Sequence, residues 1–336
     1  MPTSPRISPR PLAVAALAAF LAAPALAQTS ALDALFERGD AAVIEREVQR
    51  LLAANPTEPT ALMAAARLGI ESGDEAKLDA GVAAAERCVA AAPKLADCQL
   101  WLGRVLGVKA LNAGMLGGMR YASRVKAAFE QAVALAPDDL TARFDLNQFL
   151  LIAPGVAGGS VAAARRNTED YAARQPARAE ILRAQLDAYE EKSAAAQERL
   201  LRMPVPTDRA ERDLWGQVLV AIGIGYAFAK PPQLDAARKL LETASARRPD
   251  DPQPRYWLGR VAQEQKRYDD ARRHFEQATQ AQPQWRTWWR LAQVQEALGE
   301  AAAALANYQR ALGARPGAPE KIRKEIEERV AALKPR

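Results

Sequence analysis

Two cysteines are the residues most able to do covalent chemistry in this sequence of 336 residues. Cys88 and Cys98 lie five residues before and five residues after Pro93. If two antiparallel helices meet at this proline, the two thiols lie roughly opposite each other across the junction. In an oxidising compartment such a pair favours a disulfide. The alternative is a pair of buried free thiols that pack as small apolar side chains.

Acid–base chemistry has few candidate residues. His274 is the only histidine, and no cysteine or second histidine stands near it in a metal-binding pattern, so a solvated surface histidine is expected rather than a catalytic base. The carboxylate pairs Glu190-Glu191 and Glu327-Glu328 are consecutive, and consecutive residues of a helix point about 100° apart. We therefore expect no catalytic, metal or cofactor site, and a protein that is not an enzyme.

Two glycine-rich stretches, residues 114–118 and 155–159, could in principle cradle a phosphate. They match neither the G-x-G-x-x-G pattern after a strand nor the G-x4-G-K-[ST] pattern. Flexible loops between helices are the expected structure for both.

The first 27 residues have the pattern of a signal peptide. Arg6 and Arg10 precede an apolar run at 11–21, and residues 25–27 form an A-x-A cleavage site. The apolar run is too short to span a bilayer comfortably, and no cysteine follows the cleavage site as a lipid anchor would require. We expect an exported, soluble chain in the periplasm of a Gram-negative bacterium.

The charge of the chain is mild. The net charge of +6 falls to +4 without residues 1–27, because these hold two arginines and no acid. No run of Lys and Arg exceeds three residues, whereas nucleic-acid binders usually concentrate their basic residues. We expect no nucleic-acid partner, and no transmembrane anchor after signal cleavage.

A repeated residue pattern between Val218 and Pro316 predicts the helices that carry the side chains of this region. Three copies share the spacing A-x3-large-x2-A-x4-P, and their prolines step by 34 and 33 residues. The copies are Ala237, Leu241, Ala244 and Pro249; Ala271, Phe275, Ala278 and Pro283; Ala304, Tyr308, Ala311 and Pro316. Upstream of each copy stands a small residue: Gly225, Gly259 or Ala292.

This spacing has a physical reason. Small residues let two antiparallel helices approach closely, and the large residue fills the space between them. The proline cannot continue a helix, so the chain turns there into the next repeat.

The pattern resembles the tetratricopeptide repeat (TPR), in which W-x2-L-G-x2-Y, A-x3-F and P recur every 34 residues. The resemblance implies an all-α fold, a right-handed α-solenoid of about seven or eight stacked antiparallel helix pairs. We expect TPR-like repeats over 28–176, a degenerate repeat and linker over 177–217, three regular repeats over 218–316 and a capping helix over 317–336.

Two insertions interrupt the N-terminal repeats. From Gly103 to the small residue Val125 of the second helix there are 22 positions rather than 12, and the surplus holds the glycines at 114–118. The next repeat carries residues 153–160 at the equivalent turn. Because equivalent turns lie on one edge of a solenoid, both insertions should emerge side by side.

The repeat with the second insertion departs from the pattern. Asn147 replaces the usual small residue and Thr168 the large one, so irregular packing is expected. The line from Phe149 to Gly159 also resembles a motif of a subgroup of exported bacterial TPR proteins, for which no activity is established.

The family resemblance also implies which residues line the concave surface, namely the second, fifth, ninth and twelfth of each repeat. These are Leu219, Ile222, Tyr226 and Ala229; Gln253, Tyr256, Arg260 and Gln263; Arg286, Trp289, Gln293 and Glu296. Tyr226, Tyr256, Arg260, Arg286, Trp289 and Gln293 are the predicted partner-binding residues, because such aromatic and guanidinium groups are enriched in binding hot spots. The alternative is that Tyr256 and Trp289 pack on each other between stacked repeats.

Two functions are compatible with this pattern. The first is a scaffold that binds a protein or peptide partner on its concave surface. The second is a periplasmic carrier of a small apolar ligand or lipid, covered by the glycine-rich segments.

Overall fold

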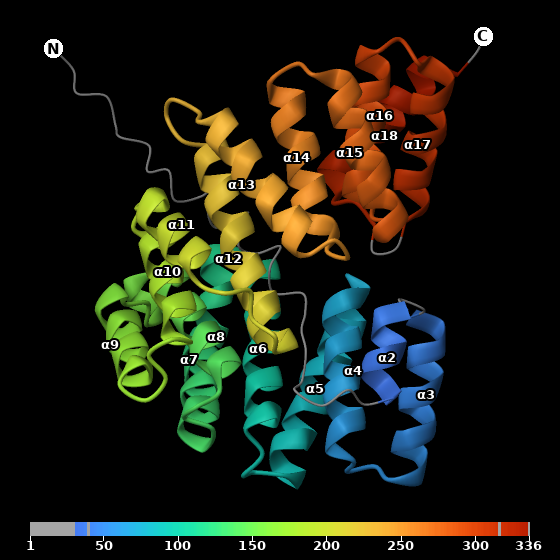
Figure 1. Cartoon of the computed structure of the whole chain (residues 1–336). Coiled ribbons are helices and arrows are strands. Elements are labelled where there is room, and N and C mark those ends of the chain that lie inside the picture. The colour runs from blue at the N-terminus through green and yellow to red at the C-terminus, as the bar shows by residue number, and fades with distance from the viewer. Residues whose placement is uncertain (1–30, 39–40, 315–316, 335–336) are drawn as a thin grey trace, which may run out of the picture. The chain divides into compact units, whose positions relative to one another are not determined.

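The computed structural model describes residues 31–38, 41–314 and 317–334 (Figure 1). These residues form seventeen α-helices, one short 3-10 helix and no strand. The helices make eight consecutive pairs followed by a final single helix, so the predicted all-α fold of stacked antiparallel helix pairs is confirmed. The chain divides into two compact units between Gln217 and Val218, and each unit is described by itself.

The N-terminal unit contains both the longest and the shortest helices of the described residues. Its helices are α2 (Ala31–Arg38), α3 (Ala41–Ala54), α4 (Pro59–Ser72), α5 (Glu75–Ala91), α6 (Ala96–Asn112), α7 (Gly114–Leu135), α8 (Leu140–Ile152), the 3-10 helix η1 (Gly155–Ala157), α9 (Val161–Ala172), α10 (Ala179–Tyr189), α11 (Ser193–Arg202) and the first part of α12 (Arg209–Ala227).

The C-terminal unit continues from the second part of α12 with regular pairs. Its helices are α13 (Leu234–Arg247), α14 (Pro252–Glu264), α15 (Tyr268–Ala281), α16 (Trp285–Ala297), α17 (Ala301–Gly313) and α18 (Glu320–Leu333). None of the helices in the described part of the chain has the length and apolarity needed to span a bilayer.

In the pairs α6–α7 and α14–α15, a glycine of the first helix faces a large side chain of the second. A Cβ added to Gly103 would lie 2.5 Å from the ring of Phe129, and one added to Gly259 would lie 2.7 Å from the ring of Phe275. Both rings are buried. The absence of a side chain at these glycines is therefore what lets the rings fill the space between the helices.

The pair α12 and α13 shows a register that differs from the predicted one. Gly223, not Gly225, is buried against the side chain of Leu241, and Gly225 is exposed. The turn between these helices carries two more residues than the pattern assumes, since Gly223 precedes Ala237 by 14 positions and Gly259 precedes Ala271 by 12. The small position of the first regular repeat is thus shifted by two residues.

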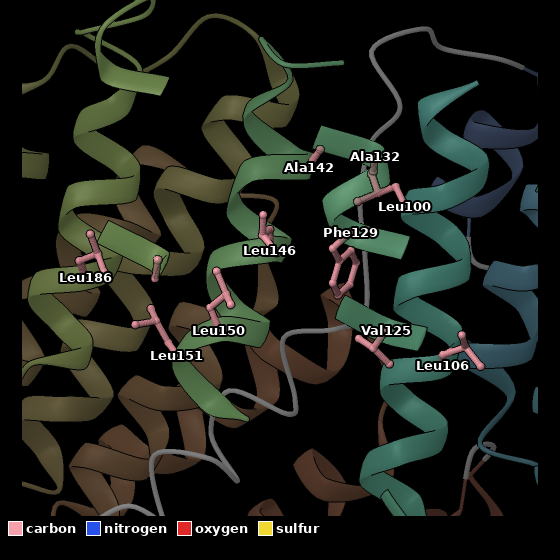
Figure 2. Packing of buried hydrophobic residues seen from close by; sticks show 11 residues of the cluster. Leu100, Leu106, Val125, Phe129, Ala132, Ala142, Leu146, Leu150, Leu151 and Leu186 are labelled. Atoms are coloured by element: carbon pink, nitrogen blue, oxygen red, sulfur yellow. The ribbon is translucent and has the colours of Figure 1, made fainter. Parts of the chain in front are cut away.

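The core of the N-terminal unit is layered by the helix pairs. Figure 2 shows Val125 and Phe129 of α7 lying between the helices that carry Leu100 and Leu146. Beyond them, Asn147 of α8 and Thr168 of α9 are both fully buried, while Leu146, Leu150 and Ala164 of the same two helices belong to the apolar cluster. The predicted departure from regular packing thus takes the form of a polar contact.

The first insertion is helical, which differs from the predicted loop. Residues 114–118 belong to α7, and Ala113 alone separates α7 from α6. The surplus residues lengthen both helices to 17 and 22 residues, because the hairpin can turn at Gly114, whose φ is +70°. At the tip Met115 and Leu116 are 81% and 86% exposed.

The second insertion is a loop that rests on its neighbour. Its 3-10 helix η1 contacts α7, and a Cβ at Gly158 would lie 3.2 Å from the side chain of Lys126. The Ser160 hydroxyl accepts a hydrogen bond from the Ala163 amide and so caps α9.

Candidate partner-binding surface

The predicted binding residues of the two most regular repeats lie on the neighbouring first helices α14 and α16, which contact each other. We use the name first-helix surface for the side chains of Tyr256, Arg260, Gln263, Arg286, Trp289 and Arg290. Asp251 caps α14 by accepting a hydrogen bond from the Gln253 amide at 2.9 Å. This capping fixes where α14 begins, and with it the direction of the side chains.

Tyr256 and Trp289 are buried, with only 8% and 9% of their surfaces exposed. Tyr256 packs against Trp257 and Phe275, with ring centroids 5.3 and 5.8 Å away, whereas Trp289 packs on Trp285 at 6.1 Å. The two residues belong to separate apolar clusters. Each ring therefore serves the core of its own repeat, and its ring face is covered by other groups.

Arginine side chains cover these rings. The Arg286 guanidinium lies 5.2 Å from the ring centroid of Tyr256 and thus joins α16 to α14. The Arg290 guanidinium lies 4.2 Å from the ring of Trp289, and that of Arg260 lies 5.8 Å from the ring of Trp257. Such stacking supports the cations through the ring faces and leaves their N–H groups free to bind other acceptors.

These three arginines, the arginine cluster, have few anionic neighbours. Arg260 approaches the exposed Glu264 only to 3.8 Å, and Arg290 donates a hydrogen bond to the Gln293 side-chain oxygen at 2.9 Å. Within the described part of the chain, no carboxylate lies within 4 Å of the Arg286 or Arg290 guanidinium. The cluster therefore carries more positive charge than its surroundings balance.

Several buried polar atoms of the surface also have no hydrogen-bond partner among the described residues. They are Nε of Arg260, Arg286 and Arg290, Nε1 of Trp289 and Oε1 of Gln263. Buried polar groups are normally paired, and an unpaired one costs about 1–3 kcal/mol. Five of the thirteen such side-chain atoms among the described residues thus lie on these two adjacent helices.

Burial affects the electrostatics of the cluster. It lowers the pKa of the Arg286 guanidinium from its ordinary value. Burial lowers the pKa of Arg290 as well, and the charge of Arg260 adds to this effect. An anion placed here would oppose both effects, because a nearby negative charge favours the charged guanidinium.

The other predicted binding residues are placed differently. Gln293 donates a hydrogen bond to Glu325 of α18 at 3.3 Å, so the final helix already engages it. Tyr226 is buried, and the register shift in α12 moves it away from the predicted groove position. Sequence reasoning missed Arg290, although its spacing of four residues from Arg286 places both on one helix face.

Residues considered for catalysis occupy ordinary surroundings. His274 is half-buried rather than fully solvated, and burial lowers its pKa below the ordinary 6.5 while the Asp270 charge opposes this. The Glu190 carboxylate pairs with Lys192 and Arg165. No group of three potential metal ligands occurs within residues 31–38, 41–314 and 317–334.

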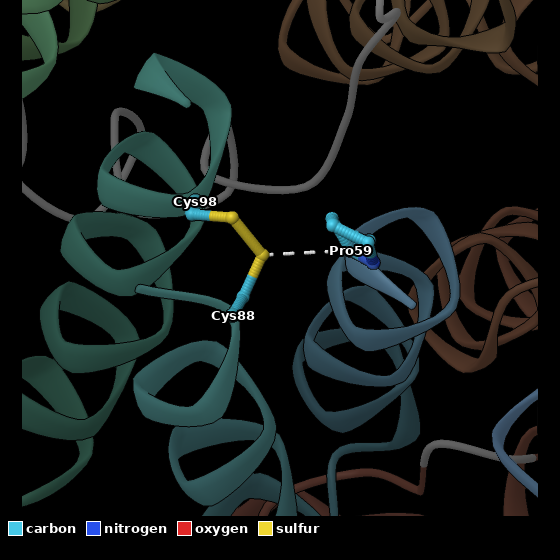
Figure 3. The surroundings of a disulfide bond; sticks show 3 residues. All are labelled: Pro59, Cys88 and Cys98. Atoms are coloured by element: carbon cyan, nitrogen blue, oxygen red, sulfur yellow. Dashed lines mark hydrogen bonds between the residues drawn. A yellow bond between two sulfur atoms is a disulfide. The ribbon is translucent and has the colours of Figure 1, made fainter. Parts of the chain in front are cut away.

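The two cysteines meet at the junction of α5 and α6. Cys88 and Cys98 are fully buried, their Cα atoms lie 5.4 Å apart, and the structure joins their sulfurs as a disulfide (Figure 3). The Cys88 sulfur lies 3.7 Å from the Pro59 carbonyl oxygen of α4. That the chain carries this bond in the cell stays a prediction, because disulfide formation depends on the redox conditions of the compartment.

A cavity of about 490 Å³ in the N-terminal unit is the other candidate site. It lies among α10, α11 and the start of α12, with Arg178, Arg199, Met203 and Glu211 in its lining. Its charges are matched internally, since Arg178 pairs with Glu211 and Arg199 donates to Glu180 at 2.6 Å. The cavity therefore lacks the unbalanced charge of the first-helix surface.

Comparison with known proteins agrees with this architecture. Family models of the tetratricopeptide repeat match residues 233–294 and 286–317. No curated protein sequence matches the chain.

Among solved structures, the chain is similar to one in the APC/C hetero-tetramer Cut9–Hcn1, with 15% identity and a TM-score of 0.50. The match covers 90% of this chain and 48% of that one, so this chain spans about half its length. PilF of Pseudomonas aeruginosa is 16% identical, with a TM-score of 0.42 and coverage of 69% and 97%. The human IFIT1 dimer with m7Gppp-AAAA is 14% identical, with a TM-score of 0.44 and coverage of 94% and 75%.

These likenesses concern the fold alone. Together with the helix pairs described above, the family-model matches show that the C-terminal part of this chain, residues 233–317, is built of tetratricopeptide repeats.

Proposed function

We propose that this protein is an exported, non-catalytic scaffold that binds a protein or peptide partner on the first-helix surface of its C-terminal unit. The observation that carries this proposal is the set of buried, unpartnered polar atoms on α14 and α16. A bound partner would supply the missing hydrogen bonds, which a folded monomer otherwise lacks at a cost in stability. Tetratricopeptide repeats generally serve as interaction scaffolds, which supports the same reading.

The composition of the surface also supports a protein partner. Arginine and aromatic residues side by side are enriched where protein interfaces gain most of their binding energy. Here the aromatic rings are fixed by the core and hold the guanidiniums in place. A surface ordered before binding loses less side-chain entropy when the partner arrives.

Export to the periplasm is part of the proposal. It rests on the signal-peptide pattern of residues 1–27, which lie outside the described residues, and on a cysteine pair placed for a disulfide. Expression in a Gram-negative host with fractionation and N-terminal sequencing checks it. A periplasmic chain that begins at Gln28 is expected, and an uncleaved cytoplasmic chain would contradict export.

Site-specific photocrosslinking tests the scaffold function. A benzoylphenylalanine at Gln263 on the first-helix surface should crosslink a discrete partner protein in cells. The same group at Gln277, which is exposed on the second helix α15, is the matched control and should not. Lipid extraction of the purified chain completes the test, since stoichiometric lipid without any crosslinked protein would point to a carrier instead.

A further inference from the structure

We propose that the tip of the α6–α7 hairpin inserts into the surface of a phospholipid bilayer that contains anionic lipids. We use the name hairpin tip for residues 110–119, which join the end of α6 to the start of α7. The hairpin tip belongs to the N-terminal unit and not to the first-helix surface, so this inference goes beyond the proposed function. It adds a membrane to the surroundings in which the scaffold binds its partner.

Four large apolar side chains are exposed at the hairpin tip. The exposed fractions are 81% for Met115 and 86% for Leu116, and they are 40% and 44% for Leu111 and Met119. These four are half of the eight exposed large apolar side chains among the described residues. Scattered apolar residues are normal on a protein surface, but a contiguous group marks a site that contacts a protein or a membrane.

The close approach of the two helices keeps these side chains on the outside. A Cβ added to Gly118 of α7 would lie 2.6 Å from the Ala110 carbonyl oxygen of α6. The two backbones therefore nearly touch at the hairpin tip, as only a glycine allows. No space is left between the helices in which Met115 or Leu116 can be buried. The apolar side chains need a different environment to leave water.

The nearest charged residues on either side of the hairpin tip are cations. Lys109 precedes it on α6, Arg120 follows it on α7, and no Asp or Glu occurs in residues 105–129. Lys109 also pairs with Asp79 of the neighbouring helix α5. Arg120 is exposed and stacks on the Tyr121 ring at 4.8 Å, and no carboxylate of the described residues lies within 4 Å of its guanidinium.

This distribution of charge matches an anionic bilayer. The uncharged hairpin tip suits the acyl region, and the cations below it suit negatively charged head groups. Tyr121 lies at the level of Arg120, where an aromatic ring with a polar end is typical of a membrane interface. The equivalent turn between α10 and α11 carries Glu190 and Glu191 instead, which an anionic surface would repel.

The length of the hairpin fits the depth of such an insertion. Helix α7 has 22 residues and the second helix of the preceding pair, α5, has 17. The surplus falls between Gly103 and Val125 and therefore at the hairpin tip. Five residues of helix amount to about 7–8 Å. Interfacial segments bury their apolar side chains about 5–10 Å deep, so the extra length reaches the boundary of head groups and acyl chains.

A bilayer fits the hairpin tip better than a protein partner does. Stable protein interfaces bury about 800 Å² on each partner and involve about 20–30 residues a side, whereas the hairpin tip has ten. It also contains no Trp, Tyr or Arg, the residues that carry most binding energy at protein interfaces. A symmetric contact between two copies would bring the Arg120 residues of both tips together with no acid in either tip to balance them.

Vesicle flotation tests the inference. The purified chain from residue 28 onward is used, because the apolar run at 11–21 would bind lipid by itself. It should float with vesicles made of equal parts of phosphatidylglycerol and phosphatidylcholine. Its affinity for vesicles of phosphatidylcholine alone should be about fivefold lower or less, since one unpaired cation near an anionic surface contributes a factor of about five. Higher salt should weaken the binding to the anionic vesicles.

Variants assign the binding to the hairpin tip. The double variant Met115→Ser/Leu116→Ser should weaken vesicle binding about tenfold or more, because it removes the two most exposed apolar side chains. Arg120→Gln should weaken binding to the anionic vesicles about fivefold. Val156→Ser is the matched control and should change nothing. Val156 is 82% exposed too, but its loop rests beside Lys126, which lies about 16 Å along α7 from Met115.

A fluorescent label measures the insertion directly. Cys88 and Cys98 are buried, so an exposed cysteine introduced as Leu116→Cys reacts first with a nitrobenzoxadiazole label. The label should brighten with anionic vesicles and be quenched by lipids that carry a nitroxide in their acyl chains. Ala134→Cys is the control, because Ala134 is exposed near the other end of α7, about 27 Å away, and a label there should show neither change.

Three results would overturn the inference. The first is the absence of vesicle binding by the folded chain, and the second is an equal loss of binding in Val156→Ser and in the double serine variant. The third is a dimer of the chain that the double serine variant dissociates in sedimentation velocity, with no vesicle bound, which would make the hairpin tip a contact between copies. The crosslinking at Gln263 tests the scaffold function separately, because it reports on the C-terminal unit.

Discussion

The Asn147 side-chain amide donates a hydrogen bond to the Thr168 hydroxyl at 2.8 Å, between two fully buried residues of α8 and α9. The Thr168 hydroxyl donates a hydrogen bond to the Ala164 carbonyl at 3.0 Å, and the Asn147 side-chain oxygen accepts one from the Asn167 amide at 2.7 Å. The pairs α6–α7 and α14–α15 place a glycine beneath a phenylalanine at these positions. One repeat thus replaces the glycine–phenylalanine contact by a network of buried hydrogen bonds.

Thr168→Val should destabilise the N-terminal unit by about 1–3 kcal/mol, because it leaves the buried Asn147 amide without its acceptor. Thr243→Val is the matched control, since the Thr243 hydroxyl only donates to the Lys239 carbonyl of its own exposed helix face. Urea denaturation followed by circular dichroism measures both. Equal midpoints for the two variants would show that the network adds no stability.

Gly103→Ala should destabilise by about 1–3 kcal/mol, since the new methyl group meets the buried Phe129 ring at 2.5 Å. Gly107→Ala in the same helix meets nothing within 4 Å and should stabilise by up to about 1 kcal/mol. Thermal melts of the two variants measure the difference. A second change, Phe129→Leu, should recover part of the loss in Gly103→Ala if the clash is its cause.

Cys88 and Cys98 should both resist alkylation in the non-reduced, denatured protein, as mass spectrometry can show. Two labelled thiols would contradict the disulfide and support the alternative of buried free thiols. If the bond is present, its reduction should cost about 2–3 kcal/mol, because it closes a loop of 10 residues. The double variant with alanine at both positions reports the contribution of the bond without any reducing agent.

Trp289→Ala should lower the stability by about 3–5 kcal/mol, because the ring is buried among core residues. Arg260→Ala should cost about 1 kcal/mol or less and still abolish partner capture. The melting temperature and the crosslinking yield, measured together, distinguish the two effects. Similar melting temperatures for the two variants would contradict the assignment of Trp289 to the core.

The stability should fall as the pH decreases through 6.5, with a contribution from His274 alone. Burial lowers the pKa of His274 in the folded state, so the unfolded chain takes up the proton first. The loss begins near the unfolded pKa of about 6.5 and stops below the folded pKa. His274→Gln should remove this component from a series of urea titrations between pH 7.5 and 5, since the chain has no other histidine.

Much of the fold could be predicted because the repeat pattern is periodic. The glycines, large residues and prolines of α14 to α17 report packing that depends only on spacing. The errors occur where spacing is broken. Two extra residues before α13 mean that Gly223, and not Gly225, packs against the second helix. The inserted residues 114–118 extend the helix α7 instead of forming a loop, because each added helical turn keeps its backbone hydrogen bonds.

The candidate site could be predicted only in part. The family pattern identifies Arg260 and Arg286, but it contains no information on which groups lack a partner. That property depends on side chains of several helices. Glu325 of α18 accepts a hydrogen bond from Gln293, whereas no residue in the described part of the chain accepts one from the buried Nε of Arg286. The importance of Arg290 likewise comes from its position over Trp289.

The long hairpin of α6 and α7 offers a site at its tip where a guest segment can be inserted into the chain. Its second helix has 22 residues, eight more than the 14 of α15, which amounts to about 12 Å of helix beyond the repeat body. The tip side chains of Met115 and Leu116 pack against little, and only Ala113 joins the two helices. For protein engineering, a guest segment between Ala113 and Gly114 would be displayed away from the packed layers, as a graft that leaves the host core unchanged.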